Sequence, residues 1–303
     1  MNTAISTNHR LWAYLQMMRP ANIVTAWADV LAGFAISGCV ILTTFETHLG
    51  SLLWLLLSTT GLYGGGIVFN DIFDAELDAV ERPERPLPSG RASYQGAVLL
   101  ASVLLSIGIL AAAKISLLSG SLACGVAAAA ILYDALGKHH KIFGPLNMGI
   151  CRGGNLLLGV SVVSPMVMQN WFLALIPIVY IAAVTTLSRG EVKGGNHSNG
   201  IVALIMLTSV IAGLLGLGLL NHDRLLAVLP FIVLLAARVL VPFIKATREP
   251  IPTNIRIAVR AGVLSLIVLD ATVAASFAGL PYGLLVLSLL PISTVLAKMF
   301  AVT

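Results

Sequence analysis

The sequence predicts an all-α fold in which many helices cross a membrane. Of its 303 residues, 58% are hydrophobic and only 10% are charged, and the mean hydropathy is +0.95. A soluble protein carries charge on about a quarter of its residues, so the surplus apolar surface must face lipid. No segment alternates apolar and polar residues over about ten positions, which excludes a membrane β-barrel.

Ten segments approach the length that crosses a bilayer. A transmembrane helix needs about 20 predominantly apolar residues, and Ala, Leu, Ile, Val and Gly dominate each segment. The shorter ones are marginal and the last could be a partial span, so we expect nine to ten helices. In chain order the predicted spans are 21–42, 50–69, 96–113, 115–132, 146–165, 171–187, 200–220, 225–243, 257–278 and 281–300.

The basic residues between these spans fall almost entirely on one side. The positive-inside rule places that side in the cytoplasm, together with the N-terminus and the long polar loops. A bacterial plasma membrane is the membrane we expect. The richer side holds Arg10, Arg19, Arg82, Arg85, Arg91, Lys138, Lys141, Arg189, Lys193, Lys245, Arg248, Arg256, Arg260 and Lys298, and the other side holds Lys114 and Arg224.

Charge and cysteine usage exclude further classes of protein. The net charge of +5 reflects the cytoplasmic loops, so we expect no nucleic-acid partner. Cys39, Cys124 and Cys151 lie far apart in apolar stretches, which supports neither a disulfide framework nor a zinc site. There is no repeat of fixed period, and we expect one integral membrane domain over residues 1–303.

The strongest polar signal is the segment Asn70–Asp78, at the cytoplasmic end of the second span. On a continuous helix Asp71, Asp74 and Asp78 fall within roughly 60° of one another, whereas Glu76 points nearly opposite. Three adjacent carboxylates repel one another, and Mg²⁺ is held by one or two carboxylates together with substrate phosphates. The segment therefore predicts a Mg²⁺ site. The alternative is a solvated helix end with an incidental acidic cluster.

A proline-rich segment follows the acids. In the residues 82–90, prolines forbid a helix and extend the residue before each of them. Such a stiff segment can hold Arg82 and Arg85 near the aspartates, where guanidinium groups recognise phosphate. The alternative is that both are ordinary positive-inside arginines.

These motifs resemble the UbiA superfamily of intramembrane prenyltransferases. Residues 70–78 match its N-D-x-x-D-x-x-x-D signature, and 82–90 match R-P-x-R-P-x-x-x-G. Arg19-Pro20-x-Asn22 and the segment 144–155 are similar to it as well. Within the superfamily the chain looks most like the EboC-type branch. The resemblance implies a bundle of about nine helices around a central cavity that cytoplasmic loops cap.

The resemblance also implies a reaction. A polyprenyl diphosphate bound through Mg²⁺ ionises, and a small, aromatic, lipophilic acceptor attacks the carbocation in a cavity that excludes water. The implied partners are these two substrates and the surrounding membrane lipids. The implied catalytic and metal-binding residues are Asp71, Asp74 and Asp78, and the implied substrate-binding residues are Asn22, Asn70, Arg82, Tyr133, Lys138, Asn147, Arg152, Asn155, Arg189, Glu191 and Lys193.

Two segments depart from the family pattern. The loop 185–195, where the family carries a second acidic motif, holds Glu191 alone between Arg189 and Lys193. We expect one Mg²⁺ rather than two, with the bases neutralising the diphosphate. A tyrosine-to-lysine pair is spaced by five residues, Tyr133 to Lys138, where the family has four, and Asp134 follows the tyrosine. The second hypothesis is therefore a carrier-type or non-catalytic relative that binds a lipophilic molecule.

Four charged residues lie inside predicted spans, where each costs about 2.5–3.5 kcal/mol on insertion scales. Arg152 is expected in the cavity wall. Asp29 and Asp270 are expected to pair with Arg238 as struts between helices. An ion-coupled transporter would need inverted repeats, and the sequence shows no such symmetry.

Overall fold

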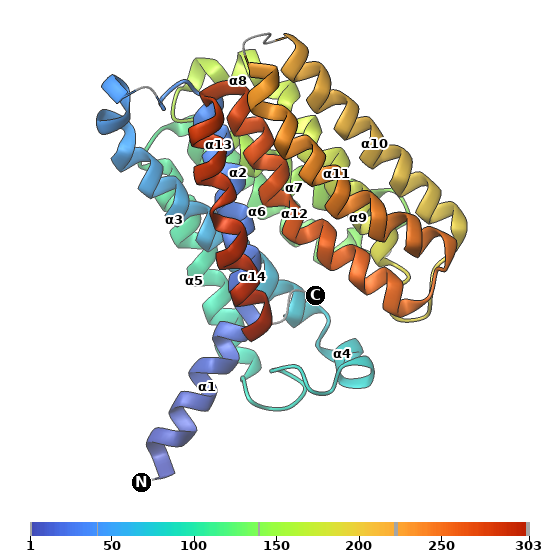
Figure 1. Ribbon diagram of the computed structural model, residues 1–303. Helices are drawn as coiled ribbons and strands as arrows, with labels where there is room; N and C mark the ends of the chain where they lie inside the picture. Colours follow the sequence, from blue (N-terminus) through green and yellow to red (C-terminus); the bar gives the residue numbers. More distant parts are fainter. Residues whose placement is uncertain (1, 41, 139, 221–223, 301–303) are drawn as a thin grey trace.

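The computed structural model describes residues 2–40, 42–138, 140–220 and 224–300, and every regular element in them is a helix (Figure 1). This confirms the all-α prediction. The helices are α1 (Asn2–Met18), α2 (Pro20–Ile36), α3 (Leu42–Phe73), α4 (Ala75–Glu81), α5 (Tyr94–Ala113), α6 (Leu117–Leu132), the π-helical turn η1 (Tyr133–Gly137), α7 (Phe143–Val160), α8 (Ser164–Asn170), the 3₁₀ turn η2 (Trp171–Ala174), α9 (Leu175–Ser188), α10 (His197–Leu220), α11 (Leu225–Arg248), α12 (Pro252–Ala278), α13 (Leu280–Leu287) and α14 (Leu289–Met299).

Eight helical segments of the described chain are long and apolar enough to cross a membrane. They include α6 with η1, the run from α8 to α9, and α13 with α14. The helices α2 and α7, with 17 and 18 residues, add two more of roughly 26 Å each. The total of ten agrees with the predicted nine to ten, and the protein is an integral membrane protein.

The centre of the bundle is formed by α2 and α12, which are buried along most of their length. Both contact each other, and α2 also packs on α7. Gly33 of α2 and Gly159 of α7 permit this close approach, since a Cβ on Gly33 would lie 2.2 Å from the carbonyl oxygen of Leu156. Small residues at such crossings let transmembrane backbones come together.

Two of the differences from the predicted spans have a cause in the local sequence. The first span ends at Ile36 rather than at 42, because Gly38 takes a positive φ of 81° that most residues avoid. The last span is interrupted at Ser288, between α13 and α14. Pro291, which has no N–H to donate to Leu287, accounts for that break.

One end of the bundle gathers the polar connections. In Figure 1 the α1–α2 junction, α4, and the α9–α10 and α11–α12 connections all lie toward the lower end, and α1 extends away from the bundle there. The segment between α4 and α5 is tied to α1, since Arg91 donates to the Gln16 side chain at 3.0 Å and Tyr14 contacts Ser93 at 3.3 Å.

Candidate active site

A cavity of about 390 Å³ opens among the helices at this polar end. Its inner walls are largely apolar and include Leu62, Ile181, Val184, Val263 and Leu266. Its polar lining comes from α2, α3, α4, η1, α7 and the loop after α9. The cavity therefore joins an apolar chamber to a charged rim.

The aspartate motif lies at the rim, on a helix that bends. Asp74 takes φ −91° and ψ 0° and separates α3 from α4, so the predicted continuous helix is interrupted there. Backbone hydrogen bonds still join Asp74 to Asn70 and Asp78 to Asp74, at 3.0 and 2.7 Å. Glu76 is exposed and outside the lining, as its helical angle predicts.

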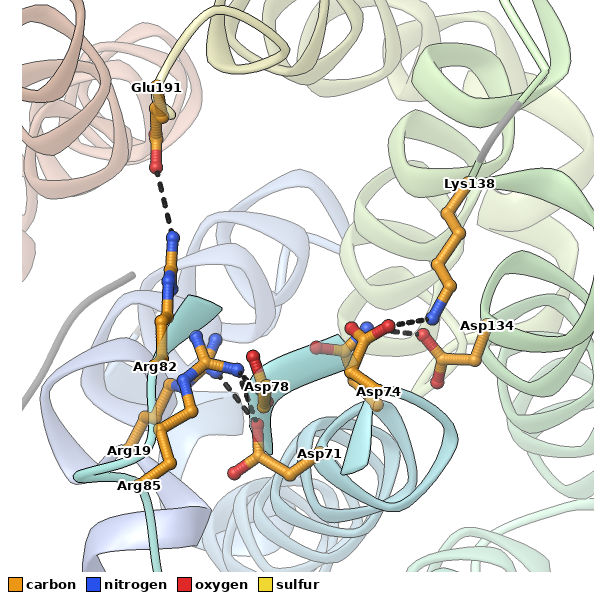
Figure 2. A network of polar contacts seen from close by, with 10 residues as sticks. Arg19, Asp71, Asp74, Asp78, Arg82, Arg85, Asp134, Lys138 and Glu191 are labelled. Atoms are coloured by element: carbon orange, nitrogen blue, oxygen red, sulfur yellow. Dashed lines mark hydrogen bonds and ion pairs between the residues drawn. The ribbon is translucent and has the colours of Figure 1, made fainter. Parts of the chain in front are cut away.

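Each carboxylate of the motif contacts a base (Figure 2). Arg85 lies 2.6 Å from Asp78 and 3.5 Å from Asp71, and Arg19 lies 2.9 Å from Asp71. Asp74 turns the other way and pairs with Lys138. The bend at Asp74 thus splits the motif into two ion-paired halves, and bases relieve the mutual repulsion of the acids.

Arg19 reaches this cluster from a strained backbone. It joins α1 to α2 with φ 48° and ψ 69°, a left-handed conformation that is uncommon for any residue other than glycine. Its guanidinium nevertheless points at Asp71. Strain of this kind persists where the surrounding structure fixes it and is often found at functional sites.

Glu191 and Arg82 face each other across the rim, 3.9 Å apart (Figure 2). Burial raises the pKa of Glu191 above its ordinary value, and Arg82 and Arg256 oppose that rise. Burial also lowers the pKa of Arg82, with a further contribution from Arg85. The partner of Glu191 is therefore Arg82 on the opposite side of the cavity mouth, rather than its neighbours Arg189 and Lys193.

The π-helical turn η1 carries the wall opposite Arg85. Its signature is the hydrogen bond from the Lys138 N–H to the Tyr133 carbonyl, five residues back, at 2.9 Å. Asp134 lies within this turn, is buried, and accepts a hydrogen bond from the Asn70 amide at 2.7 Å. Such turns accommodate one additional residue and are frequent at functional sites.

Asp134 was not among the predicted site residues, although it lines the cavity. The signal that could have found it is the unusual five-residue spacing from Tyr133 to Lys138. Arg19 and Arg85 also line the cavity, and they stand in the motifs that carried the family resemblance.

At the inner end of the polar lining, Arg152 is buried against α2 and α3. It donates to Asp29 at 2.8 Å, to the Thr25 hydroxyl at 2.6 Å and to the Tyr63 hydroxyl at 3.0 Å. Asn155 donates to Asp29 at 2.9 Å. The expected pairing with Arg238 is wrong, because Asp29 pairs with Arg152 while Arg238 contacts the Ser265 hydroxyl at 3.3 Å.

The structure brings most predicted site residues to one cavity and leaves four outside its lining. Asp71 lies behind the rim, held by Arg19 and Arg85. Arg189 donates to the His140 carbonyl, and Lys193 is exposed. Asn147 lies on α7 near Gly137. The lining contains Asn22, Asn70, Asp74, Asp78, Arg82, Tyr133, Lys138, Arg152, Asn155 and Glu191.

The donor set at the rim suits Mg²⁺ together with phosphate. No three His, Cys, Asp or Glu side chains in the described ranges form a ready metal site. Mg²⁺, however, needs only one or two carboxylates when substrate phosphates complete its shell. Asp74 and Asp78 offer carboxylate oxygens to the cavity, and the adjacent bases suit the anionic partner.

Comparisons with known proteins agree with this architecture. Digeranylgeranylglyceryl phosphate synthase of Methanothrix thermoacetophila is 36% identical over 179 residues, which cover 59% of this chain and 63% of that protein. Among solved structures, a UbiA homolog from Aeropyrum pernix K1 has a TM-score of 0.68 at 16% identity, over 82% of this chain and 96% of that chain.

A second solved structure is a UbiA homolog from Archaeoglobus fulgidus bound to GPP and Mg²⁺. It has a TM-score of 0.54 at 13% identity and covers 91% of this chain and 99% of that chain. The sequence itself matches the UbiA prenyltransferase family over residues 31–251. That match covers well over half of the chain, so the protein belongs to the UbiA prenyltransferase family.

Proposed function

We propose that the protein is an intramembrane prenyltransferase, which moves a polyprenyl group from its diphosphate to a small lipophilic acceptor. One observation carries the proposal: Asp74 and Asp78, with Arg82, Arg85 and Lys138, line the mouth of a cavity whose inner walls are apolar. The mouth suits a diphosphate and its cation, and the apolar chamber suits the prenyl chain.

In the proposed reaction the allylic C–O bond breaks and its electron pair leaves with the diphosphate. The acceptor then forms a bond to the allylic carbon and loses a proton. Mg²⁺ held at Asp74 and Asp78 supplies charge neutralisation for the leaving diphosphate. Apolar walls such as Leu62 and Val263 exclude the water that would otherwise trap the carbocation.

The bases of the rim exchange partners in this account. Without substrate, Arg85 and Lys138 neutralise Asp78 and Asp74. Asp78 and Asp74 would hold the cation that accompanies a diphosphate, and Arg85 and Lys138 would then donate charge-assisted hydrogen bonds to the phosphate oxygens. Arg82 serves the same end from the Glu191 side. The loop bases Arg189 and Lys193, which we expected to take the role of a second metal, lie outside the lining, so a single Mg²⁺ would rely on Arg82, Arg85 and Lys138 instead.

The acceptor and the subfamily are further parts of the proposal. The sequence interpretation favours an aromatic acceptor and an EboC-type branch. The name of the Methanothrix relative instead points to a prenylated glyceryl phosphate product for that relative. The aligned region spans less than two thirds of that relative, so we propose only a lipophilic acceptor for this chain and test both classes side by side.

We further propose that residues 1–303 form one domain, and that the rim faces the cytoplasm of a bacterial plasma membrane. The support is the basic asymmetry of the loops and the common end at which α4 and the α9–α10 and α11–α12 connections lie (Figure 1).

The test is diphosphate release by the purified protein in detergent with Mg²⁺, a prenyl diphosphate and either a phenolic acid or a prenylated glyceryl phosphate. We expect one acceptor class to give a prenylated product by mass spectrometry. Asp74→Asn should lower the rate about 100-fold or more, since it weakens charge stabilisation at the leaving group. The matched control is Glu76→Gln, on the same segment but outside the lining, and should retain activity.

The carrier hypothesis makes a different forecast. A carrier would bind the prenyl diphosphate in an Asp74-dependent manner and release no diphosphate with any acceptor. That result would overturn the transferase proposal while keeping the binding site. It would also indicate that the loop 185–195, which has one acid where the family carries a second acidic motif, has lost a part that catalysis needs.

A further inference from the structure

A second polar cluster lies deeper in the bundle than the aspartate motif. Its members are Asp29 of α2, Arg152 and Asn155 of α7, and Asp270 of α12, all of them almost completely buried. They occupy the middle of their helices, away from the polar rim. The proposed transfer reaction uses Arg152 as part of the cavity lining and gives no role to the two carboxyl groups.

The hydrogen bonds of this cluster are unevenly distributed. Oδ2 of Asp29 accepts from Arg152 at 2.8 Å and from Asn155 at 2.9 Å. Oδ1 of Asp29 and both carboxyl oxygens of Asp270 are buried and receive no donor from the described residues. Helices α2 and α12 pack against each other, and the two carboxyl groups are fully buried at this contact, where each acts on the other electrostatically.

Two ionised carboxylates accept hydrogen bonds and donate none, so a direct hydrogen bond between them requires a proton. The charge balance gives the same answer. Arg152 contributes one positive charge and has one carboxylate, Asp29, as its direct partner. A second negative charge on Asp270, which is entirely buried, would have no partner of its own, and unpaired buried charge is strongly disfavoured.

We propose that Asp29 and Asp270 share one proton, so that the pair carries a single negative charge and serves as the counter-ion that positions Arg152 in the cavity wall. Asp29 is the ionised member and accepts hydrogen bonds from Arg152 and Asn155 through Oδ2. Asp270 is the protonated member and donates to Oδ1 of Asp29. The proton thus satisfies Oδ1 of Asp29 and one of the two Asp270 oxygens, and through Arg152 the pair links α2, α7 and α12.

The geometry gives Arg152 a fixed orientation. Its guanidinium bonds Asp29, the Thr25 hydroxyl and the Tyr63 hydroxyl, and it lies 4.6 Å from the centre of the Tyr63 ring. Asp29 and Thr25 of α2 and Tyr63 of α3 supply these contacts. Asp29, together with Asp270 behind it, is therefore a positioning residue for a cavity-lining cation. This positioning role rests on the proposed function, whereas the shared proton does not.

The experiment compares the purified full-length protein with Asp270→Asn and Asp29→Asn by infrared spectroscopy and thermal unfolding in detergent. An amide at 270 has the shape of the carboxylic acid and donates to Asp29 in the same way. We expect a carbonyl band of a protonated carboxylic acid, sensitive to D₂O, that Asp270→Asn removes while Tm stays within about 2 °C. Asp29→Asn leaves Arg152 without its counter-ion and should lower Tm by about 5 °C or more.

Three results would overturn the proposal. The first is the absence of a difference band between the wild type and Asp270→Asn, which would mean that both carboxyls are ionised. The second is a clear rise in Tm for Asp270→Asn, which would show relief of repulsion between two charges. The third is a Tm of the wild type that depends on Na⁺ compared with choline, which would assign a bound cation in place of the proton.

Activity measurements separate this proposal from the function itself. Asp29→Asn should lower prenyl transfer at least tenfold, and Asp270→Asn, which still donates to Asp29, should lower it less. If the wild type shows no transfer, the function fails while the infrared band and the Tm difference still decide the shared proton. If transfer is present but the band is absent, the shared proton fails alone.

Discussion

At the scale of single residues, Arg85 joins the two ends of the aspartate motif. One guanidinium nitrogen lies 2.6 Å from Asp78 and 3.5 Å from Asp71, although these acids stand seven positions apart in the sequence. The prolines of the segment 82–90 keep the chain out of a helix there and bring Arg85 back toward α3. Arg85 thus competes with a cation for the carboxylates and attracts a diphosphate to the same place.

Replacing Arg85 with alanine should therefore change two affinities in opposite directions. Without substrate, Mn²⁺ affinity measured by electron paramagnetic resonance should rise about threefold to tenfold, because a competing ion pair is lost. Diphosphate release should fall about 100-fold, because a stabilising donor is lost. Lys245→Ala, on the exposed face of α11, is the control. If metal affinity fell together with activity, Arg85 would be a structural support for the motif.

Glu191 gives the rim a defined response to pH. Because burial raises the pKa of its carboxyl, the folded protein holds that proton to higher pH than the unfolded chain. The resulting stabilisation is complete below the ordinary pKa of 4.5 and is lost as the pH rises through the folded-state pKa. Glutamine at this position does not titrate.

The Tm of Glu191→Gln relative to wild type should therefore increase between pH 4.5 and about pH 7.5. Thermal unfolding in detergent at both pH values gives the difference directly. A difference that stays constant or shrinks would mean that Arg82 holds Glu191 ionised throughout this range.

At the scale of elements, the α2–α7 crossing fixes the inner wall of the cavity. Gly33 and Gly159 let the two backbones touch, and this contact brings Asp29 and Arg152 within 2.8 Å. Glycine costs about 1 kcal/mol in a helix relative to alanine, so helix propensity does not account for these two glycines. Their place at the close crossing of α2 and α7 does.

Gly33→Ala should lower the free energy of unfolding by about 1–3 kcal/mol, because its Cβ would overlap backbone that cannot move aside. The control is Gly216→Ala on α10, where a Cβ meets nothing within 4 Å, and that variant should be unchanged or slightly stabilised. Thermal unfolding of the two variants checks this pair. Equal effects would show that the α2–α7 contact is looser than the structure places it.

The limits of prediction from sequence are visible in the same elements. The lengths of the apolar segments were enough to locate the spans, because in lipid each crossing segment must hydrogen-bond its own backbone N–H and C=O groups by forming a helix. The bend at Asp74 was not predictable, since the local sequence 70–78 suits a continuous helix and only the pairing of Asp74 with Lys138 and of Asp78 with Arg85 separates the two halves. The partner of Asp29 was also missed, because helix spacing does not say which helices adjoin.

The π-helical turn η1 shows what a spacing anomaly means in three dimensions. The five-residue interval from Tyr133 to Lys138 is one residue longer than the family pattern. The backbone accommodates the additional residue by a π-type hydrogen bond, in which the Lys138 N–H donates to the carbonyl of Tyr133, five positions earlier. Both side chains thereby remain in the cavity lining together with Asp134. An unusual interval is thus a sign of a local π turn as well as of a lost motif.

At the scale of the whole molecule, charge separates the two ends of the bundle. The rim of the cavity, the segment 82–93 and the connections after α9 and α11 share one end (Figure 1), and the sequence places most of its basic residues there. Lys114 belongs to the connection between α5 and α6 at the other end, and Arg224 precedes α11. The asymmetry predicts that substrates with phosphate groups arrive from the cytoplasmic side.

Cysteine labelling of intact cells tests that orientation. In a variant with alanine at Cys39, Cys124 and Cys151, Ser89→Cys should resist a membrane-impermeant maleimide until the cells are permeabilised. Lys114→Cys, exposed at the opposite end, should react in intact cells. The physical reason is that moving the long basic loops across a membrane against the positive-inside rule is unfavourable. Labelling of Ser89→Cys from outside would invert the topology, and the cavity rim would then open away from the cytoplasm.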